Sequence, residues 1–449
     1  MKGFIHKNWL RSCFVFLLGF TFLGVISGQG TSCDCVPNEV IVQLFNPANL
    51  PAVAAQYGLD PAPIEQIATP EIFRLRITGG QTPTQVVTAM QGDARIIFGE
   101  TNRKLSQVER EGLSWTQGQS WAIGQSWAIG GSAKGYGRQY FPGRIRLNEA
   151  FAAAGTKGLR VDNNQPIVVA VLDTGIDLTH PAFAGKLVPG YDFVDGDEDP
   201  SEVGVLYQDA AFGHGTHVAG IVALTAPDVK IMPIRILDRN GEGQLWRITA
   251  AMIWAANHGA DVVNLSAGYK DNVRLLKDLL DCLDDGVTLD GTNTTFPQIG
   301  THRLAVTVAS GNGGSSAPVY PAFESADGML GVASSTRYGE LLSKFSSYNR
   351  HDIDVTAPGE NIISALPGGR YGSWTGTSMA APIVAGIVAL VKARYPTTFA
   401  APHVMLERVK ETSIDKRYDT ATWGEVRLNR VDALCAVTNN LACPLPPTP

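Results

Sequence analysis

The sequence predicts an α/β fold in which a doubly wound, mostly parallel sheet is flanked by helices, with a small ferredoxin-like α+β domain before it. Two observations lead to this class. After residue 143, apolar strand-like runs alternate with longer runs of helical periodicity, which is the order of a parallel sheet covered on both faces. Before residue 104, strand-like and helical stretches follow one another as βαββαβ, which is typical of a ferredoxin-like unit.

The composition is that of a globular protein. The 449 residues include 36 basic and 42 acidic side chains, and the formal net charge of -6 excludes a strongly basic nucleic-acid-binding protein. Hydrophobic residues make up 44% and charged residues 17%, which excludes a charge-rich disordered chain. The 48 glycines and 26 prolines follow no Gly-X-Y period, so they indicate many turns and exclude a collagen-like helix.

Residues 1–28 have the pattern of a secretory signal peptide. Basic residues come first, an apolar run from Cys13 to Ile26 follows, and small residues from Ser27 to Gly30 end the pattern. The apolar run is shorter than the ~20 residues that span a bilayer, which disfavours the alternative of a retained anchor. A lipoprotein signal at Cys33 is a further alternative, although Gly30 stands where such a signal carries a leucine-like residue. The sequence therefore predicts a secreted protein without membrane attachment after signal removal.

Five cysteines remain after removal of Cys13 with the signal, and an odd number cannot all pair within one chain; they are Cys33, Cys35, Cys282, Cys435 and Cys443. Export makes a disulfide feasible, with Cys435 and Cys443 the favoured couple. The sequence does not assign the pairing, and thiols without chemistry are an equally open alternative.

The small N-terminal domain is predicted to span residues 38–103. Strands are expected at Val40–Leu44, near Ile64, at Ile72–Ile77 and at Arg95–Phe98, and helices at Leu50–Tyr57 and Thr84–Met90. A unit of this size without obvious disulfides buries a marginal core, so we expect it to need a partner for stability.

Residues 104–136 are predicted to be a linker rich in Gly, Ser, Gln and Trp. The hexapeptide Gly118–Ile123 is repeated at once as Gly124–Ile129. This indicates a local duplication in a connector, and a tryptophan-containing binding motif is the alternative.

The main domain is predicted to span residues 137–436, followed by a Pro-rich tail at 437–449. Its strands are expected at Ile167–Leu172, Val229–Leu237, Val262–Leu265 and Leu304–Ala309, and its helices at His217–Leu224, Trp246–His258, Leu275–Leu283 and Pro382–Tyr395. In such sheets, sites gather at the carboxyl ends of strands.

Three short motifs each place a polar residue beside glycine at the end of an apolar run. The polar residues are Asp173, His214 and Ser378. An acid at a strand end, a histidine that opens a helix and a serine that opens another are the parts of an acyl-transfer triad. Taken singly, each residue has a plain alternative as a helix cap or turn residue, but the set of three favours catalysis.

With these motifs, the chain resembles the subtilisin-like serine endopeptidases over roughly residues 140–434. The order Asp, His, Ser is that of subtilisin and differs from the orders in chymotrypsin and the α/β-hydrolases. The resemblance implies peptide-bond hydrolysis through an acyl-enzyme, with Ser378 as nucleophile, His214 as general acid and base, and Asp173 orienting His214. It also implies that Asn312 is the side-chain donor to the oxyanion; a turn asparagine between glycines is the alternative.

The resemblance further implies how a substrate binds. Two segments resemble the family stretches that hold an extended peptide between them as an added strand, and their residues are Gly241, Gly243, Ser266, Ala267 and Gly268. By the same resemblance Val319 lies at the floor of the primary pocket, where a branched apolar side chain makes the pocket short. We therefore expect cleavage after small or medium apolar residues and not after lysine or arginine.

A calcium site is suggested by the resemblance of an acidic loop to one in thermitase-like members, with candidate ligands Asp192, Asp195, Asp197 and Asp199. A solvated acidic loop is the alternative. A second family calcium site is expected to be lost, because Ala182 replaces its usual aspartate. A zinc site at His214 and His217 lacks further ligands, and no redox or organic cofactor is implied.

Residues 38–103 resemble the inhibitory propeptide of these proteases, which keeps the enzyme inactive until it has folded. Their last strand is expected to enter the cleft, and the enzyme is expected to cut its own linker within 104–136. The expected partners are polypeptide substrates and this propeptide as intramolecular inhibitor; we expect a monomer that binds no nucleic acid. The alternative functions are a catalytically silent secreted peptide-binding module and a secreted esterase with the same triad.

Overall fold

The computed structural model describes residues 33–68, 71–108, 131–205, 208–285, 303–324, 326–338, 342–349, 352–398, 401–420 and 424–438. The chain divides into two compact units, 1–33 and 34–449, and both sheets described below belong to the second. The predicted signal peptide, the tryptophan-containing repeat and Cys443 lie outside the described residues.

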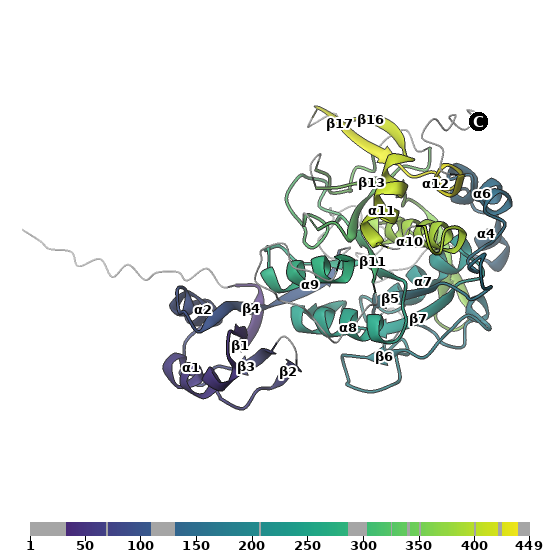
Figure 1. Cartoon of the computed structure of the whole chain (residues 1–449). Helices are drawn as coiled ribbons and strands as arrows, with labels where there is room; N and C mark the ends of the chain where they lie inside the picture. Colours follow the sequence, from purple (N-terminus) through teal and green to yellow (C-terminus); the bar gives the residue numbers. More distant parts are fainter. Residues whose placement is uncertain are drawn as a thin grey trace, which may run out of the picture. The chain divides into compact units, whose positions relative to one another are not determined.

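The N-terminal sheet has the predicted βαββαβ order. Its strands are β1 (Cys35–Leu44), β2 (Glu65–Ala68), β3 (Glu71–Arg76) and β4 (Ile96–Gln107), and its helices are α1 (Leu50–Tyr57) and α2 (Pro83–Met90). The four strands are antiparallel in the order β4-β1-β3-β2 (Figure 1). Alternate residues of β1, such as Val40 and Val42, pack against the two helices, which explains the alternation seen in the sequence.

The strand β4 is longer than predicted. We expected it to end at Phe98 and the linker to start at residue 104, but the strand continues to Gln107. Residues Lys104–Gln107 pair with two short strands of the main domain, β8 (Glu242–Gln244) and β10 (Ala267–Gly268). The predicted boundary therefore falls inside a strand, because distant partners stabilise a segment whose own sequence resembles a linker.

The main sheet confirms the predicted doubly wound class. Its nine strands lie in the order β16-β17-β13-β12-β11-β9-β5-β7-β6, and every pair is parallel except β16 with β17. The strands are β5 (Val168–Asp173), β6 (Tyr191–Asp192), β7 (Lys230–Arg235), β9 (Val262–Leu265), β11 (Ala305–Ala309), β12 (Met329–Ser335), β13 (Val355–Pro358), β16 (Ile414–Thr420) and β17 (Gly424–Arg430). The strand order reverses between β5 and β9, which is where such folds place their sites.

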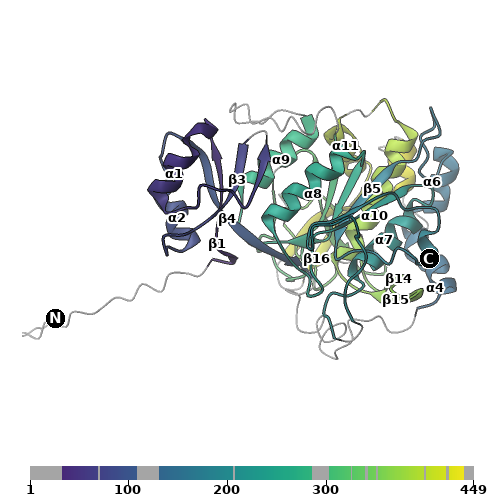
Figure 2. The ribbon, with the colours of Figure 1, turned by 90° about the horizontal axis from the view of Figure 1, so that it is seen from below.

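Two helical layers cover the main sheet (Figure 1, Figure 2). Val169 and Val171 of β5 belong to a core with α7 (His214–Thr225) and α10 (Thr377–Arg394). Ala170 and Leu172 belong to a second core with α8 (Leu245–Asn257) and α9 (Arg274–Asp285). Because successive strand residues point to opposite faces, the continuous apolar run of β5 fills both cores.

The remaining described elements are distributed over both domains. They are the 3₁₀ turns Pro47–Asn49 and Pro181–Phe183, the helices α4 (Ala133–Arg138), α5 (Phe141–Arg144), α6 (Leu147–Ala154), α11 (Pro402–Glu411) and α12 (Ala433–Thr438), and the hairpin β14 (Ile362–Leu366) and β15 (Arg370–Trp374). Within the described part of the chain, only α10 has the length and hydropathy of a membrane-crossing helix, and 89% of it is buried, as in a core helix.

Cys33, Cys35 and Cys435 are disulfide-bonded, and Cys282 is buried in α9. The predicted pairing of Cys435 with Cys443 stays a prediction, because Cys443 lies outside the described residues.

Candidate active site

The predicted acid and base of the triad are in contact. Asp173 is the last residue of β5 and His214 the first of α7, and Nδ1 of His214 donates to Oδ1 of Asp173 at 2.7 Å. Both residues are at most 1% exposed. The Thr174 N–H donates to the same Oδ1 at 2.8 Å, which fixes the carboxylate. Because Nδ1 carries the proton, Nε2 is the ring nitrogen that is able to accept one.

Ser378 is the second residue of α10, and a hydrogen-bond pair joins it to the end of β9. Its Oγ donates to the Ser266 carbonyl at 3.4 Å, and the Ser266 Oγ donates to the Ser378 carbonyl at 3.3 Å. Pro382, four residues further along α10, has no N–H to give to that carbonyl. The Ser266 hydroxyl therefore replaces a missing helical hydrogen bond and fixes the turn that carries Ser378.

Asn312 follows β11 and faces the start of α10. Its Oδ1 accepts hydrogen bonds from the N–H and the hydroxyl of Thr377, at 2.9 and 3.0 Å. The amide is thus fixed by its oxygen, and Nδ2 is its donor end. The N-cap residue of α10, Gly376, has no side chain to cap the helix itself. An Asn312 Nδ2 and backbone N–H groups at a helix N-terminus are suitable donors for an oxyanion.

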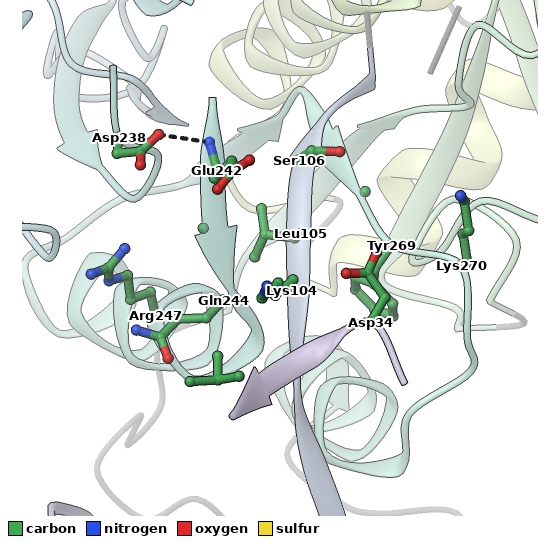
Figure 3. Close-up of a pocket in the computed structure, with 13 residues that line it drawn as sticks. Asp34, Lys104, Leu105, Ser106, Asp238, Glu242, Gln244, Arg247, Tyr269 and Lys270 are labelled. Atoms are coloured by element: carbon green, nitrogen blue, oxygen red, sulfur yellow. Dashed lines mark hydrogen bonds between the residues drawn. The ribbon is translucent and has the colours of Figure 1, made fainter. Parts of the chain in front are cut away.

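The predicted substrate-binding segments hold the chain's own strand β4. Leu105 pairs with Gly243 and Ser106 with Glu242 on one side, and Ser106 pairs with Gly268 and Gln107 with Ala267 on the other. The Gln107 N–H also donates to the Gly241 carbonyl at 3.0 Å. Figure 3 shows Leu105 and Ser106 between Glu242 and Gln244 on one side and Tyr269 on the other. These segments therefore bind an extended peptide as an antiparallel strand.

Val319 lies in a cavity next to Asn312. Its two methyl groups pack against Gly268 and Gly311. A Cβ added at Gly268 would lie 2.6 Å from Cγ1 of Val319, and one added at Gly311 would lie 2.8 Å from Cγ2. Val108, the residue after β4, is 4% exposed and lines the same cavity. The cavity is thus lined by Val108, Val319 and Asn312, and the predicted place of Val319 at its floor stays a prediction.

His217 has a different environment from His214. Its Nε2 donates to the carbonyls of Ile362 and Gly372, and burial lowers its pKa to about 3. A histidine that stays neutral and bonds backbone carbonyls supports packing of the β14–β15 hairpin.

The acidic loop does not form a ligand cluster in the described residues. Oδ2 of Asp192 and of Asp195 each lie 2.5 Å from Nη1 of Arg235, a β7 residue that the sequence analysis did not connect with the loop. Asp197 and Asp199 accept backbone N–H groups further along the loop. Across the part of the chain that the structure describes, no three His, Cys, Asp or Glu side chains gather as a metal site. The four aspartates do not fit a calcium ion in this arrangement, because Arg235 already binds two of them.

Sequence reasoning missed the residues that support the triad. Thr377 orients Asn312, and Thr174 and Thr216 bind the carboxylate of Glu202. The threonines stand inside or next to the three motifs, so adjacency could have indicated them. Glu202 has no such signal, because it lies outside the three motifs, in the segment that follows the acidic loop.

Comparisons with known proteins agree with this geometry. The family model that matches is described as the subtilase family, and it covers residues 164–430. The thermophilic serine proteinase of Bacillus sp. (strain AK1) is 37% identical over 280 residues, 60% of this chain and 61% of that proteinase. Thermitase of Thermoactinomyces vulgaris is 33% identical over 308 residues, 66% of this chain and 96% of thermitase.

A solved structure has the same fold. Fervidolysin from Fervidobacterium pennivorans, described as a keratinolytic enzyme related to subtilisin, matches 92% of this chain and 62% of its own, with a TM-score of 0.65 and 24% identity. The chain thus spans about three fifths of fervidolysin and of the AK1 proteinase and nearly all of thermitase.

Proposed function

Because the chain belongs to the subtilase family, we propose that it is a secreted serine endopeptidase that hydrolyses extended polypeptides and is made as a zymogen that cuts itself. The observation that carries the proposal is the position of the chain's own strand β4, which pairs with both substrate-binding segments beside Ser378. The signal-peptide pattern of residues 1–28 supports secretion. The enzyme acts as a single chain on polypeptide substrates.

The reaction uses four side chains. The Ser378 Oγ attacks the carbonyl carbon while Nε2 of His214 takes its proton, and Asp173 stabilises the imidazolium that forms. The Asn312 Nδ2 and the backbone N–H of Ser378 bind the oxyanion. His214 then gives the proton to the leaving amine, and an acyl-enzyme on Ser378 remains. Water, deprotonated by His214, releases the acyl group and restores the serine.

The pairing register supports one particular cleavage site in the proposed zymogen. Gln107 lies opposite Ala267, so the next residue along an antiparallel pair, Val108, continues to a place opposite Ser266. The Ser266 carbonyl is the group that accepts the Ser378 hydroxyl hydrogen bond. We therefore expect the carbonyl of Val108 to lie beside the nucleophile, and the Val108 side chain lines the same cavity as Val319. The proposed cut is the bond from Val108 to Glu109, inside the predicted range 104–136.

Contacts outside the cleft support a propeptide role for the N-terminal domain. The Glu100 carboxylate accepts the backbone N–H groups of Arg274 and Leu275 at the start of α9, at 2.5 and 3.2 Å. The Asn102 Oδ1 accepts the N–H of Trp246 at the start of α8, at 3.2 Å. Helix N-termini leave such N–H groups without partners inside the helix, so β4 completes two helices of the main domain. A domain that caps these helices and fills the cleft can assist folding and inhibit the product.

Autoprocessing tests the proposal. The purified wild-type chain and its Ser378→Ala variant are incubated side by side, with mass spectrometry and N-terminal sequencing over time. We expect a new terminus at Glu109 in the wild type and an intact variant. Processing of both chains would refute the triad. Casein hydrolysis by an uncut wild type would refute the propeptide assignment, and ester hydrolysis without amide hydrolysis would favour the esterase. A chain that neither processes nor cleaves, while binding peptides, would favour the binding module.

A further inference from the structure

Glu202 has a carboxylate that the reaction above does not use, although it lies between the two elements that carry the acid and the base. The residue as a whole is partly exposed, but its carboxylate end is desolvated, and this burial raises the pKa of Glu202 to about 7. Enclosing a carboxylate costs free energy unless hydrogen bonds compensate. Its hydrogen bonds therefore indicate what it holds in place.

Both carboxylate oxygens bind threonines next to the triad. Oε1 accepts the Thr174 hydroxyl at 2.6 Å, and Thr174 directly follows Asp173. Oε2 accepts the hydroxyl and the N–H of Thr216 at 2.7 and 3.1 Å, and Thr216 lies in the same helical turn as His214. One carboxylate thus bridges the end of β5 and the start of α7.

The two threonine hydroxyls tie these elements together a second time. The Thr174 Oγ accepts the Gly215 N–H at 2.9 Å, and the Thr216 Oγ accepts the Asp177 N–H at 2.9 Å. Each hydroxyl therefore receives a hydrogen bond from the opposite element while it donates to Glu202. A hydroxyl has a single hydrogen to donate. Because each threonine donates that hydrogen to Glu202, its oxygen is oriented to accept the backbone N–H from the opposite element.

The start of α7 depends on this arrangement because its N-cap residue, Gly213, has no side chain. The first N–H groups of a helix need outside partners, and a carboxylate near a helix N-terminus is also favoured by the helix dipole. Here the partners are Thr174 for Gly215 and Glu202 for Thr216. A loop residue thus supplies the cap that the glycine lacks, in the turn that carries the catalytic histidine.

We propose that Glu202 is a positioning residue of the active site, which holds the Asp173 turn and the first turn of α7 together so that His214 Nδ1 stays in hydrogen-bond contact with Asp173. It touches neither substrate nor the reacting atoms and acts through Thr174 and Thr216. The expected loss of activity rests on the proposed function, whereas the expected change in the hydrogen bond between His214 and Asp173 does not. The two consequences can be measured separately.

The structural measurement is made on Ser378→Ala protein, which avoids self-digestion. The proton shared by His214 Nδ1 and Asp173 gives a far-downfield ¹H NMR resonance. We expect Glu202→Gln and Glu202→Ala to broaden or shift it, and Thr174→Val to do the same more weakly. The matched control is Asp354→Asn. Asp354 is another enclosed carboxylate, and it accepts a hydrogen bond from the backbone N–H of Gly331 at 2.9 Å. It directly precedes β13 and lies away from the triad. An unchanged resonance in folded Glu202 variants would overturn the proposal, whether or not the protein is a protease.

The kinetic measurement follows peptide hydrolysis by the processed enzymes. We expect Glu202→Gln to lower kcat about 10- to 100-fold, as small misplacements of catalytic groups do, with KM changed less than about 2-fold. Adding Thr174→Val to Glu202→Gln should cost little more, because both act through one network. Asp354→Asn should leave kcat unchanged. If Glu202→Ala does not fold, Thr174→Val still decides: a wild-type kcat in that variant, or in Glu202→Gln, would overturn the proposal.

Discussion

The buried pair between Arg235 and Asp192 offers a test of how the acidic loop is stabilised. These residues face each other across the parallel pair β6–β7, and their side chains are 3% and 2% exposed. Changing Arg235→Met keeps the apolar stem of the side chain and removes the charge. It leaves the Asp192 carboxylate enclosed without its cation, which costs about 3–5 kcal/mol in comparable buried pairs.

This loss can be converted into a melting temperature. The main domain has about 300 residues, and an unfolding entropy of about 2.1 cal/mol/K per residue then makes 3–5 kcal/mol equal to roughly 5–8 °C. Arg235 also binds Asp195, but that carboxylate is 59% exposed and contributes little. The double change Arg235→Met with Asp192→Asn should recover most of the loss, because no buried charge remains unpaired.

The assay is thermal and denaturant unfolding in the Ser378→Ala background, so that unfolded chains are not digested. The matched control is Arg239→Met, the same change on the same segment, since Arg239 is 61% exposed and 3.5 Å from Asp209. We expect a loss below about 1 kcal/mol there. Equal effects of the two arginine changes, or no recovery in the double variant, would show that the loss does not come from an unpaired Asp192 carboxylate.

Three further predictions concern the site. Asn312→Ala should lower kcat about 10²–10³-fold with little change in KM, a magnitude measured on a subtilisin for the same kind of donor, and an unchanged kcat would remove Asn312 from the mechanism. Val319→Gly should deepen the pocket and shift cleavage in a peptide library toward larger apolar side chains; an unchanged preference would contradict its place at the pocket floor. His217 keeps a pKa of about 3 in the folded chain, whereas the unfolded chain binds the proton below about 6.5, so stability should fall as the pH drops through this range. Between pH 7 and 5 the wild type should lose about 2 kcal/mol more in denaturant unfolding than His217→Asn, and equal losses would refute the pKa assignment.

The sequence predicted those elements whose signals are local. The apolar runs of β5, β9 and β11 and the helices around His214 and Ser378 lie where periodicity and motif placed them. The strand β12 was missed because its second half, Gly331–Ser335, has one branched apolar residue among small and polar ones and is buried by neighbouring strands on both sides. The hairpin β14–β15 was missed although Gly368 and Gly369 mark its turn.

The missed contacts are those between residues far apart in the chain. The spacing of the aspartates suggested a cation, but nothing in that spacing shows that Arg235 reaches two of them from another strand. Likewise, the linker composition of residues 104–107 does not reveal that they pair with β8 and β10. The role of Glu202 becomes visible only in the folded chain, where β5 and α7 lie side by side. Such pairings are set by tertiary structure and override local preference.

Covalent labelling tests directly whether Ser378 is the nucleophile that cleaves the peptide bond. The processed enzyme is treated with a phosphonylating reagent for activated serines while it hydrolyses a peptide that spans residues 102–113, and the label is located by peptide mapping. We expect one label on Ser378, loss of cleavage after Val108 in proportion to labelling, and no labelling of His214→Ala. A label on another residue, or full peptide cleavage by fully labelled protein, would contradict it.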